Sequence, residues 1–265
     1  MGTTDKQTEY LYAHLRDLRE DADKGMLRAS GFYTPGELVL VRRWIASAGC
    51  PRVLVYGGYE YAERARVYFL PEYMEYSQGE SIAAQLADYG YDDPTVVLCI
   101  RASGFRSLSH RDFMGSVLSL GIERSTVGDI VCVSGDCAYL FCDRAISGYI
   151  CDNLKKVAND AVIVQVSCVP EGRFGERQYT EIRDTVASLR MDAIVASACN
   201  ISREAAKKTV TSGLCELNWE TVDTPDAEVS AGDVFSIRGK GKYTLYRIDG
   251  ENARGRLRIV IHKYT

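Results

Sequence analysis

The amino-acid sequence predicts an α+β fold built from three successive domains, at residues 1–76, 77–170 and 182–265. Segments with helical hydrophobic spacing alternate with short apolar runs typical of strands. The order of these elements changes near residue 77. Residues 170–181 contain one proline, two glycines and mixed charges, and are expected to form a linker. A length of 265 residues allows two or three small domains with buried cores.

The first domain is expected to be a helical α/β unit. Thr34-Pro35-Gly36-Glu37 predicts a helix start, with threonine as the N-cap, proline at the first helical position and glutamate reaching back. Strands are expected at 53–56 and 67–70. An earlier amphipathic helix is indicated by apolar residues at helical spacing: Leu11, Leu15, Leu18 and Ala22.

Seven aromatic residues lie between Tyr56 and Tyr76. Packing within the strands is the favoured interpretation of this cluster, because aromatic residues are enriched in strands. Stacking on nucleic-acid bases is the alternative.

The middle domain is expected to have the element order βαββαβ. Its strands are predicted at 96–100, 129–133, 139–142 and 162–168, and its helices at 109–120 and 144–157. This is the order of the ferredoxin-like fold, which many RNA-recognition modules share. The fold alone does not establish function, and we find none of the aromatic signatures of a true RNA-recognition motif at the strand positions.

Ser109-His110-Arg111-Asp112 contains the His-Arg-Asp triplet of protein kinases. The kinase interpretation fails, since Val117 stands where the metal-binding asparagine is required, and neither a glycine-rich loop nor a strand lysine is present. A capping box formed by Ser109 and Asp112 is the simpler account. Arg101, Arg106 and Arg111 would then surround an exposed loop with no acid between them, either gripping phosphates or merely solvated.

Charge is unevenly distributed along the chain. The net charge is −4, yet residues 236–265 carry 8 basic and 2 acidic residues. A local positive surface attracts phosphate backbones even on an acidic protein. Roles that need a broadly positive surface, such as DNA packaging or membrane coating, are disfavoured.

The nine cysteines contain no Cys-x-x-Cys, and the three histidines are scattered. We therefore expect buried, reduced cysteines and no structural metal. No signal peptide and no long apolar run is present, which predicts a cytoplasmic protein without a membrane segment.

The third domain is expected to open with two short helices. Ser202 is a suitable N-cap for the second helix, and Gly213 a suitable residue just beyond its end. Between these caps the helical step places Arg203, Lys207 and Lys208 on one side, within about 140°.

Gly239-Lys240-Gly241-Lys242 lacks the spacing of a phosphate-binding P-loop. Its glycines could let the backbone approach RNA while its lysines supply charge, or it could be a bare turn. Residues 243–248 and 257–261 are expected to form a β-hairpin whose loop carries Arg254 and Arg256.

The order of these features resembles the S4 RNA-binding domain. The matching elements are an arginine–hydrophobe–aspartate start at Arg190-Met191-Asp192, then Ser202-Arg203, a glycine-terminated turn, Asn218 and Gly232-Asp233. The sequence departs from the pattern at Leu214-Cys215-Glu216 and at Trp219, where the family usually has a more apolar strand and a glycine.

The resemblance extends to the bacterial YlmH-type S4 proteins over nearly the full chain. It is carried by Tyr56-Gly57-Gly58-Tyr59 with Ala62-Glu63-Arg64, by the run from Ser109 to Ile130, and by Arg238 to Lys242 with Gly255-Arg256. It implies a protein that binds structured RNA, ribosomal and in some cases transfer RNA, on the large ribosomal subunit. Members of this family are associated with stalled large subunits and with the cell-division gene neighbourhood.

Carried over by motif, the resemblance implies two sets of RNA-contacting residues. Arg190 and Arg203 would be the main contacts, with Asp192 orienting the first helix. The full first set is Arg190, Asp192, Ser202, Arg203, Lys207, Lys208, Asn218, Arg238, Lys240 and Lys242. The second set is Arg101, Arg106, Arg111, Arg124, Arg254 and Arg256.

The leading hypothesis is a non-enzymatic RNA-binding protein with no cofactor. We find no nucleophile elbow, paired metal-binding histidines or dinucleotide loop. An RNA-modifying enzyme, such as a pseudouridine synthase or methyltransferase with an appended S4 domain, is the alternative. A cell-division scaffold is a third.

Overall fold

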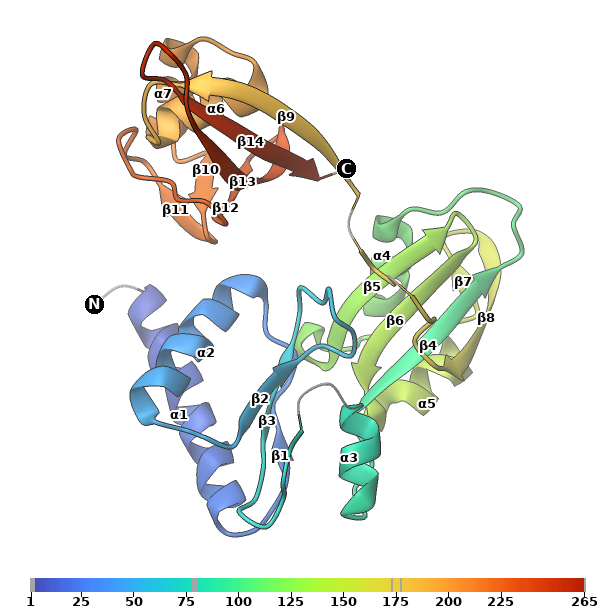
Figure 1. Ribbon diagram of the computed structural model, residues 1–265. Helices are drawn as coiled ribbons and strands as arrows, with labels where there is room; N and C mark the ends of the chain where they lie inside the picture. Colours follow the sequence, from blue (N-terminus) through green and yellow to red (C-terminus); the bar gives the residue numbers. More distant parts are fainter. Residues whose placement is uncertain (1–2, 78–80, 173, 177, 265) are drawn as a thin grey trace. The chain divides into compact units, whose positions relative to one another are not determined.

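The computed structural model describes residues 3–77, 81–172, 174–176 and 178–264. The chain divides into a first unit, residues 1–175, and a second unit, residues 176–265 (Figure 1). Together they contain three antiparallel sheets, two in the first unit and one in the second. Within the described residues, no helix has both the length and the apolar character needed to cross a bilayer.

The first sheet has the strand order β1-β3-β2 and is covered on one face by two helices (Figure 1). Its strands are β1 (Arg28–Ala29), β2 (Val53–Tyr56) and β3 (Arg66–Phe69), and the helices are α1 (Thr3–Asp23) and α2 (Pro35–Ala48). The shared core consists of six buried side chains: Leu15, Ala22, Val41, Trp44, Val67 and Phe69.

The predicted capping box at the start of α2 is confirmed. The Thr34 amide donates to Glu37 Oε2 over 2.7 Å, and the Glu37 amide donates to Thr34 Oγ1 over 3.3 Å. Gly49 ends the helix in the left-handed conformation that glycine adopts without steric cost. The sequence therefore specifies both ends of α2 locally.

A short helix absent from the prediction, α3 (Ile82–Asp88), packs beside the first sheet. Ile82 and Leu86 join Tyr68, Leu70 and Met74 in a second small core. The sheet thus buries apolar side chains on both faces. With only seven residues and no side-chain hydrogen bond at its N-cap Ser81, α3 lacks a strong sequence signal.

The second sheet has the order β5-β6-β4-β8-β7, with antiparallel neighbours throughout. The predicted element order βαββαβ is observed, with a short strand, β7, added. The elements are β4 (Thr95–Ala102), α4 (His110–Leu118), β5 (Val127–Ser134), β6 (Cys137–Asp143), α5 (Arg144–Asn153), β7 (Lys156–Val157) and β8 (Asp160–Ser167), with a 3-10 turn at Arg124–Thr126. The second helix ends four residues earlier than predicted, because Leu154 leaves the helical conformation before β7.

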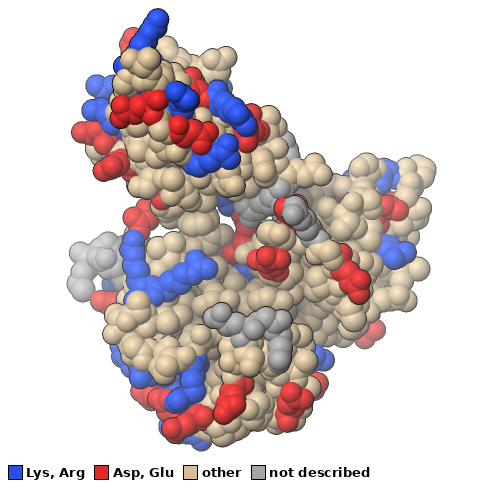
Figure 2. Space-filling model, viewed as in Figure 1, with Lys and Arg blue, Asp and Glu red and all other residues tan. Residues whose placement is uncertain are grey.

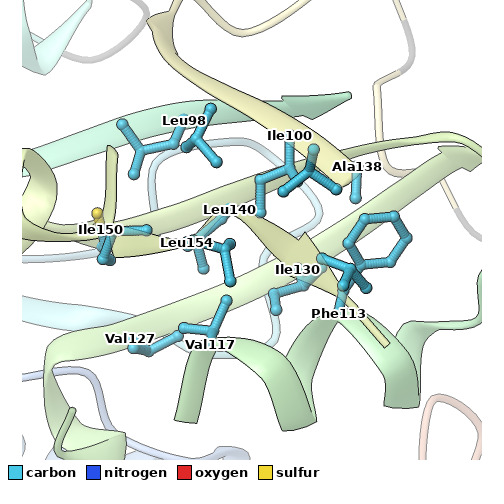
Figure 3. Close-up of a cluster of buried hydrophobic side chains, with 14 of the residues drawn as sticks. Leu98, Ile100, Phe113, Val117, Val127, Ile130, Ala138, Leu140, Ile150 and Leu154 are labelled. Carbon is cyan, nitrogen blue, oxygen red and sulfur yellow. The ribbon is translucent and has the colours of Figure 1, made fainter. Parts of the chain in front are cut away.

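Alternate residues of the central strands point to opposite faces of this sheet. On the helix-covered face, Leu98, Ile100 and Leu140 pack against Phe113 and Val117 of α4, all without solvent exposure (Figure 3). On the other face, Val97 and Phe141 pack against Tyr59 of the N-terminal segment.

Two buried arginines connect the first two sheets. The Arg66 guanidinium is 2 % exposed and donates to Ser30 O over 2.8 Å, Pro94 O over 2.8 Å and Asp143 Oδ2 over 2.6 Å. Arg64 donates to the carbonyls of Phe32, Arg124 and Val127. The boundary expected at residue 76 therefore separates two sheets that belong to one compact unit.

Asp129 is a further link between these sheets. Its carboxylate accepts hydrogen bonds from the Glu63 amide over 2.7 Å, from the Arg64 amide and from the Tyr59 hydroxyl. Gly58, which precedes Tyr59 in the sequence, has φ +101°, and a Cβ on this residue would lie 2.4 Å from the Phe141 ring. Glycine is therefore required where the chain crosses the sheet.

The second unit is a six-stranded sheet covered by two helices on one face. The strand order is β11-β10-β12-β13-β14-β9. The strands are β9 (Tyr179–Val186), β10 (Cys215–Leu217), β11 (Glu220–Val222), β12 (Val234–Ile237), β13 (Gly241–Glu251) and β14 (Leu257–Tyr264), and the helices are α6 (Met191–Cys199) and α7 (Arg203–Thr211). The predicted hairpin is confirmed as β13 and β14.

The expected linker, residues 170–181, is shorter than predicted. Residues 179–181 belong to β9, which pairs with β14 from Tyr179↔Tyr264 to Val186↔Leu257. Residues 173 and 177 lie outside the described part of the chain. The strand was missed because Tyr179–Val186 is mostly polar and exposed, so it has no clear hydrophobic alternation.

We expect Arg66→Met to destabilise the first unit by about 3–5 kcal/mol, because it breaks a buried ion pair and leaves buried carbonyls without donors. Calorimetry should show a lower unfolding temperature for the first unit and none of this change in the second. Arg28→Met is the control, since Arg28 is 41 % exposed in its pair with Asp21 and should cost about 1 kcal/mol or less. Equal effects of the two variants would contradict this role of Arg66.

Candidate nucleic-acid interface

A buried aspartate at the start of α6 holds two arginines. Arg190 is the N-cap residue and Asp192 lies in the first turn, a favourable position for a carboxylate. Asp192 Oδ1 lies 3.3 Å from Arg190 Nε, and Asp192 Oδ2 lies 2.8 Å from Arg203 Nη2. The Asp192 side chain is 7 % exposed, whereas the two arginine side chains are 46 % and 49 % exposed.

This arrangement orients the arginines and leaves them accessible. Each guanidinium has five N–H donors, and Asp192 occupies one of them in each arginine. One carboxylate against two guanidiniums leaves a net positive charge at the surface. The remaining donors are suited to phosphate oxygens, for which the planar guanidinium is a preferred partner.

The pKa of Asp192 is lowered. Burial acts to raise it, but the hydrogen bonds and positive charges of Arg203 and Arg190 outweigh that effect. The carboxylate therefore stays ionised, and the arginines stay oriented, well into the acid range.

Helix α7 continues the positive surface. Ser202 accepts a hydrogen bond from the Ala205 amide, which confirms it as the N-cap. Ala206 and Val210 are buried, while Lys207 and Lys208 are exposed on the outer side. Lys208 lies 3.2 Å from Glu204, a pair exposed on both sides and therefore weak. The predicted placement of the cations on one side of this helix is confirmed, and the buried residues lie on the other side.

A groove of about 630 Å³ lies beyond the end of α7. Its walls include Gly213, which follows the helix, Arg238 of the turn between β12 and β13, and Lys242 at the start of β13. Gly213, Gly239 and Gly241 all have positive φ, so the backbone turns closely here. Glu216 also lines the groove and accepts from Ser236 Oγ over 3.0 Å, which reduces the local positive charge.

Asn218 was predicted to contact RNA, but its side chain is hydrogen-bonded within the fold. Its amide nitrogen donates to Asp233 Oδ1 over 2.9 Å, and its oxygen accepts from the Val234 amide over 3.0 Å. Both ends of this side chain are therefore used inside the fold. Asn218 fixes the turn between β10 and β11 to β12 and is a structural residue.

Trp219 is the residue of this surface that the sequence interpretation missed. Asn218 and Trp219 have φ of 48° and 65°, forming the two-residue turn between Leu217 and Glu220. The indole is 37 % exposed, and Lys242 Nζ lies 5.3 Å from the ring centroid. The sequence did contain a signal for an exposed aromatic ring at this turn, because Trp219 directly follows the turn-forming Asn218.

The three middle-domain arginines predicted around the loop before α4 are exposed, and RNA contact by them stays a prediction. Arg106 lies 3.3 Å from Asp112 in the first turn of α4, so an acid lies beside the loop although none lies within it. Asp112 also completes the confirmed capping box with Ser109. Arg101 and Arg111 are exposed.

Arg124 was predicted as a secondary RNA contact, and its side chain is hydrogen-bonded within the fold. Its guanidinium donates to Val127 O over 2.6 Å and to Gly128 O over 3.2 Å. Burial, together with the neighbouring charge of Arg64, lowers the pKa of Arg124 to about 10. This partly buried arginine therefore supports the fold, and RNA contact by it stays a prediction.

Arg254 and Arg256 lie at the opposite end of β13 from Lys242. Their turn is held by Asn252, whose side-chain oxygen accepts from both arginine amides. Arg256 also donates to Thr185 O. An 11-residue strand spans about 30 Å, so these arginines do not extend the groove beside Lys242.

Surface charge on the second unit is mixed. In the view of Figure 2, lysine and arginine side chains are interspersed with acidic ones over the visible face of this unit. The candidate interface is therefore defined by the positions of particular lysine and arginine side chains and not by the overall charge of the surface. It consists of Arg190, Arg203, Lys207, Lys208, Arg238, Lys240 and Lys242, with Asp192 and Ser202 as supporting residues.

We expect Asp192→Asn to destabilise the second unit by about 1–3 kcal/mol at pH 7, because two charge-assisted hydrogen bonds are weakened. A carboxylate with a lowered pKa stabilises the folded state fully above its unfolded pKa, which is near the ordinary value of 3.8, and loses that effect as pH falls through its folded pKa. The difference from wild type should therefore shrink in calorimetry as the pH falls below 3.8. Asp226→Asn, at an exposed acid, is the control. A difference that is independent of pH would contradict this assignment.

Comparison with known proteins identifies relatives of this chain. Residues 95–170 match the family model described as "Putative RNA-binding domain in YlmH". The chain is 29 % identical over 207 residues to the ribosome-associated protein quality control protein P2 of Bacillus subtilis, covering 78 % of this chain and 76 % of that protein.

Among solved structures, the cell division protein ylmH from Streptococcus pneumoniae matches with a TM-score of 0.49 and 18 % identity, over 63 % of this chain and 93 % of that one. The segment that the family model matches, residues 95–170, includes the run from Ser109 to Ile130, which carries the motif similarity. The resemblance to the YlmH-type proteins is therefore confirmed, and residues 95–170 match the RNA-binding domain described for that family.

Proposed function

We propose that this protein is a non-enzymatic RNA-binding protein that docks on structured RNA of the large ribosomal subunit, ribosomal and in some states transfer RNA, during rescue or quality control of stalled ribosomes. The named role of the B. subtilis relative in ribosome-associated quality control supports this proposal. The family description of residues 95–170 supports RNA as the ligand. The cytoplasm is the compartment in which it would act.

The proposal assigns a ferredoxin-like fold to the middle segment and an S4-like fold to the second unit. The order β5-β6-β4-β8 with two helices on one face supports the first assignment. The pair α6 and α7 packed on a small antiparallel sheet, with the arginine–aspartate start of α6, supports the second.

The observation that carries the proposal is the position of Arg190 and Arg203 on one buried carboxylate. A merely solvated arginine needs no such support, and ordering a long side chain costs conformational entropy. Fixing two guanidiniums in advance reduces the entropy lost when a phosphate binds. The lysines of α7 and of the turn from Arg238 to Lys242 would add less directional charge along the same RNA.

The two alternatives make different predictions. An RNA-modifying enzyme would change the mass or base composition of RNA incubated with it, and a methyltransferase would be stabilised by S-adenosylmethionine in a thermal-shift assay. A cell-division scaffold would bind a division protein tightly after RNA has been removed. Either result would favour the corresponding alternative over RNA docking.

We expect Arg190→Ala/Arg203→Ala to weaken co-sedimentation with large ribosomal subunits and to flatten its salt dependence. Each lost phosphate contact should reduce the slope of log K against log salt by roughly 0.7–0.9. The measurement is co-sedimentation at rising salt, with folding of each variant checked by calorimetry.

A matched control removes two exposed arginines from the opposite face of the same sheet. Arg183 and Arg258 lie next in sequence to Ile182 and Ile259, which pack in the core of the second unit, so their side chains point away from it. Arg183→Ala/Arg258→Ala should sediment like wild type. Unchanged sedimentation of the Arg190/Arg203 variant would count against this site.

A further inference from the structure

A tryptophan lies beside the groove of the candidate interface, in a small hollow of its own. This hollow has a volume of about 160 Å³ and is lined by Trp219, Val234 and three residues that also line the groove: Glu216, Ser236 and Lys242. Those three residues are paired in register across β10, β12 and β13. Because the hollow and the groove share them, the two form one continuous depression on the second unit.

The depression lies on the face of the sheet opposite α6 and α7. Phe235 and Tyr243 pack in the core, so their sequence neighbours Ser236 and Lys242 point to the other face. Strands β11, β10 and β12 form one edge of this sheet, and β14 and β9 form the other. The depression is therefore separated from the two arginines on β9 and β14 that serve as the control for ribosome binding.

Trp219 occupies a backbone position that is unfavourable for a large side chain. It is the second residue of a two-residue turn and has φ 65°. Such turns prefer asparagine followed by glycine, because both residues need positive φ. Other residue types held in this conformation are strained, and they concentrate at ligand-binding sites. Trp219 is also 37 % exposed, so burial accounts for only part of the indole surface.

The indole is open to a stacking partner. Among the described residues no aromatic ring packs on Trp219, and Lys242 Nζ lies 5.3 Å from its ring centroid. Lysine is a flexible side chain, and an exposed contact between an ammonium and a ring is weaker than a nucleobase stacked on a ring. A base can therefore take the place of the ammonium on the indole, and the ammonium stays close enough to bind the adjoining phosphate.

Charge differs between the two parts of the depression. Glu216 lines both parts, and its carboxylate repels phosphate but accepts hydrogen bonds from the edge of a base. Arg238 lines the groove and not the hollow of Trp219, and with Lys240 it is exposed in the turn between β12 and β13. A Cβ on Gly239 would meet nothing within 4 Å, so this turn is open to close approach. The hollow is thus suited to a base and the turn to a phosphate.

We propose that this depression binds one unpaired nucleotide of a structured RNA, with its base stacked on Trp219 and its phosphate held by Arg238 and Lys242. Bases in a regular RNA duplex are out of reach of most side chains, whereas bases of loops and bulges can be stacked on aromatic rings. The inference rests on the proposed RNA-binding function and specifies the class of RNA, a stem interrupted by an unpaired nucleotide. Stacking releases no counterions, so the affinity that it adds is not removed by salt.

The test uses the full chain and two fluorescein-labelled RNA hairpins with the same stem. One carries a single bulged adenosine, and the other carries an abasic site at the same position, which retains the phosphate and lacks the base. In fluorescence anisotropy, the wild-type protein should bind the adenosine hairpin about fivefold or more tightly than the abasic one. Trp219→Gly should bind the two hairpins within about twofold of each other. Glycine suits the turn better than tryptophan, so this loss of preference does not reflect a damaged fold.

Tyr179→Ala is the matched control, because Tyr179 is an aromatic residue of the same sheet, 50 % exposed and at the opposite edge. This variant should keep the wild-type preference for adenosine. Tryptophan emission gives a second readout, since the chain has two tryptophans and the other, Trp44, is 7 % exposed in the N-terminal core. The adenosine hairpin should quench the emission of Trp219, and the abasic hairpin should not.

Salt dependence separates this inference from the proposed interface. Arg190→Ala/Arg203→Ala should flatten the salt dependence of binding for both hairpins, whereas Trp219→Gly should leave its slope unchanged. A preference for adenosine that persists in Trp219→Gly, or equal binding of the two hairpins by wild type, would overturn the stacking site and leave RNA binding intact. Failure of the wild-type protein to bind either hairpin would contradict RNA binding itself, and this inference with it.

Discussion

A buried charge must be paired or hydrogen-bonded, and both units of this protein are organised around such groups. In the first unit, the guanidiniums of Arg64 and Arg66 bind carbonyls from three separate segments and join two sheets. In the second unit, Asp192 lies under two arginines at the junction of α6 and α7. The first arrangement fixes the fold, whereas the second directs positive charge outward.

The local part of the structure could be predicted from the sequence. The capping boxes at Thr34 and Ser109, the cap at Ser202 and the turn at Gly213 depend on residues a few positions apart, and all are observed. Short apolar runs likewise predicted the central strands of the middle sheet, and the caps at Ser202 and Gly213 predicted helix α7. These features need no knowledge of tertiary contacts.

The use of each polar side chain could not be predicted in the same way. Arg124 and Arg203 are both arginines beside helical turns, yet one binds carbonyls inside the fold and the other faces solvent. Asn218 matched a family position and is fully engaged with Asp233 and Val234. The partners that decide these roles come from distant segments, so only the folded structure reveals them.

Strand β9 forms one edge of the six-stranded sheet and has β14 as its neighbour. The pairing begins at Tyr179, before the domain start that sequence motifs alone suggest. A recombinant fragment beginning at residue 182 would leave His262, Lys263 and Tyr264 without their partners Glu181, Thr180 and Tyr179 on the β9 side of β14. Their exposed amides and carbonyls would be open to pairing with another molecule, which favours aggregation. Isolation of a well-behaved second unit therefore requires the chain from about residue 176 onward.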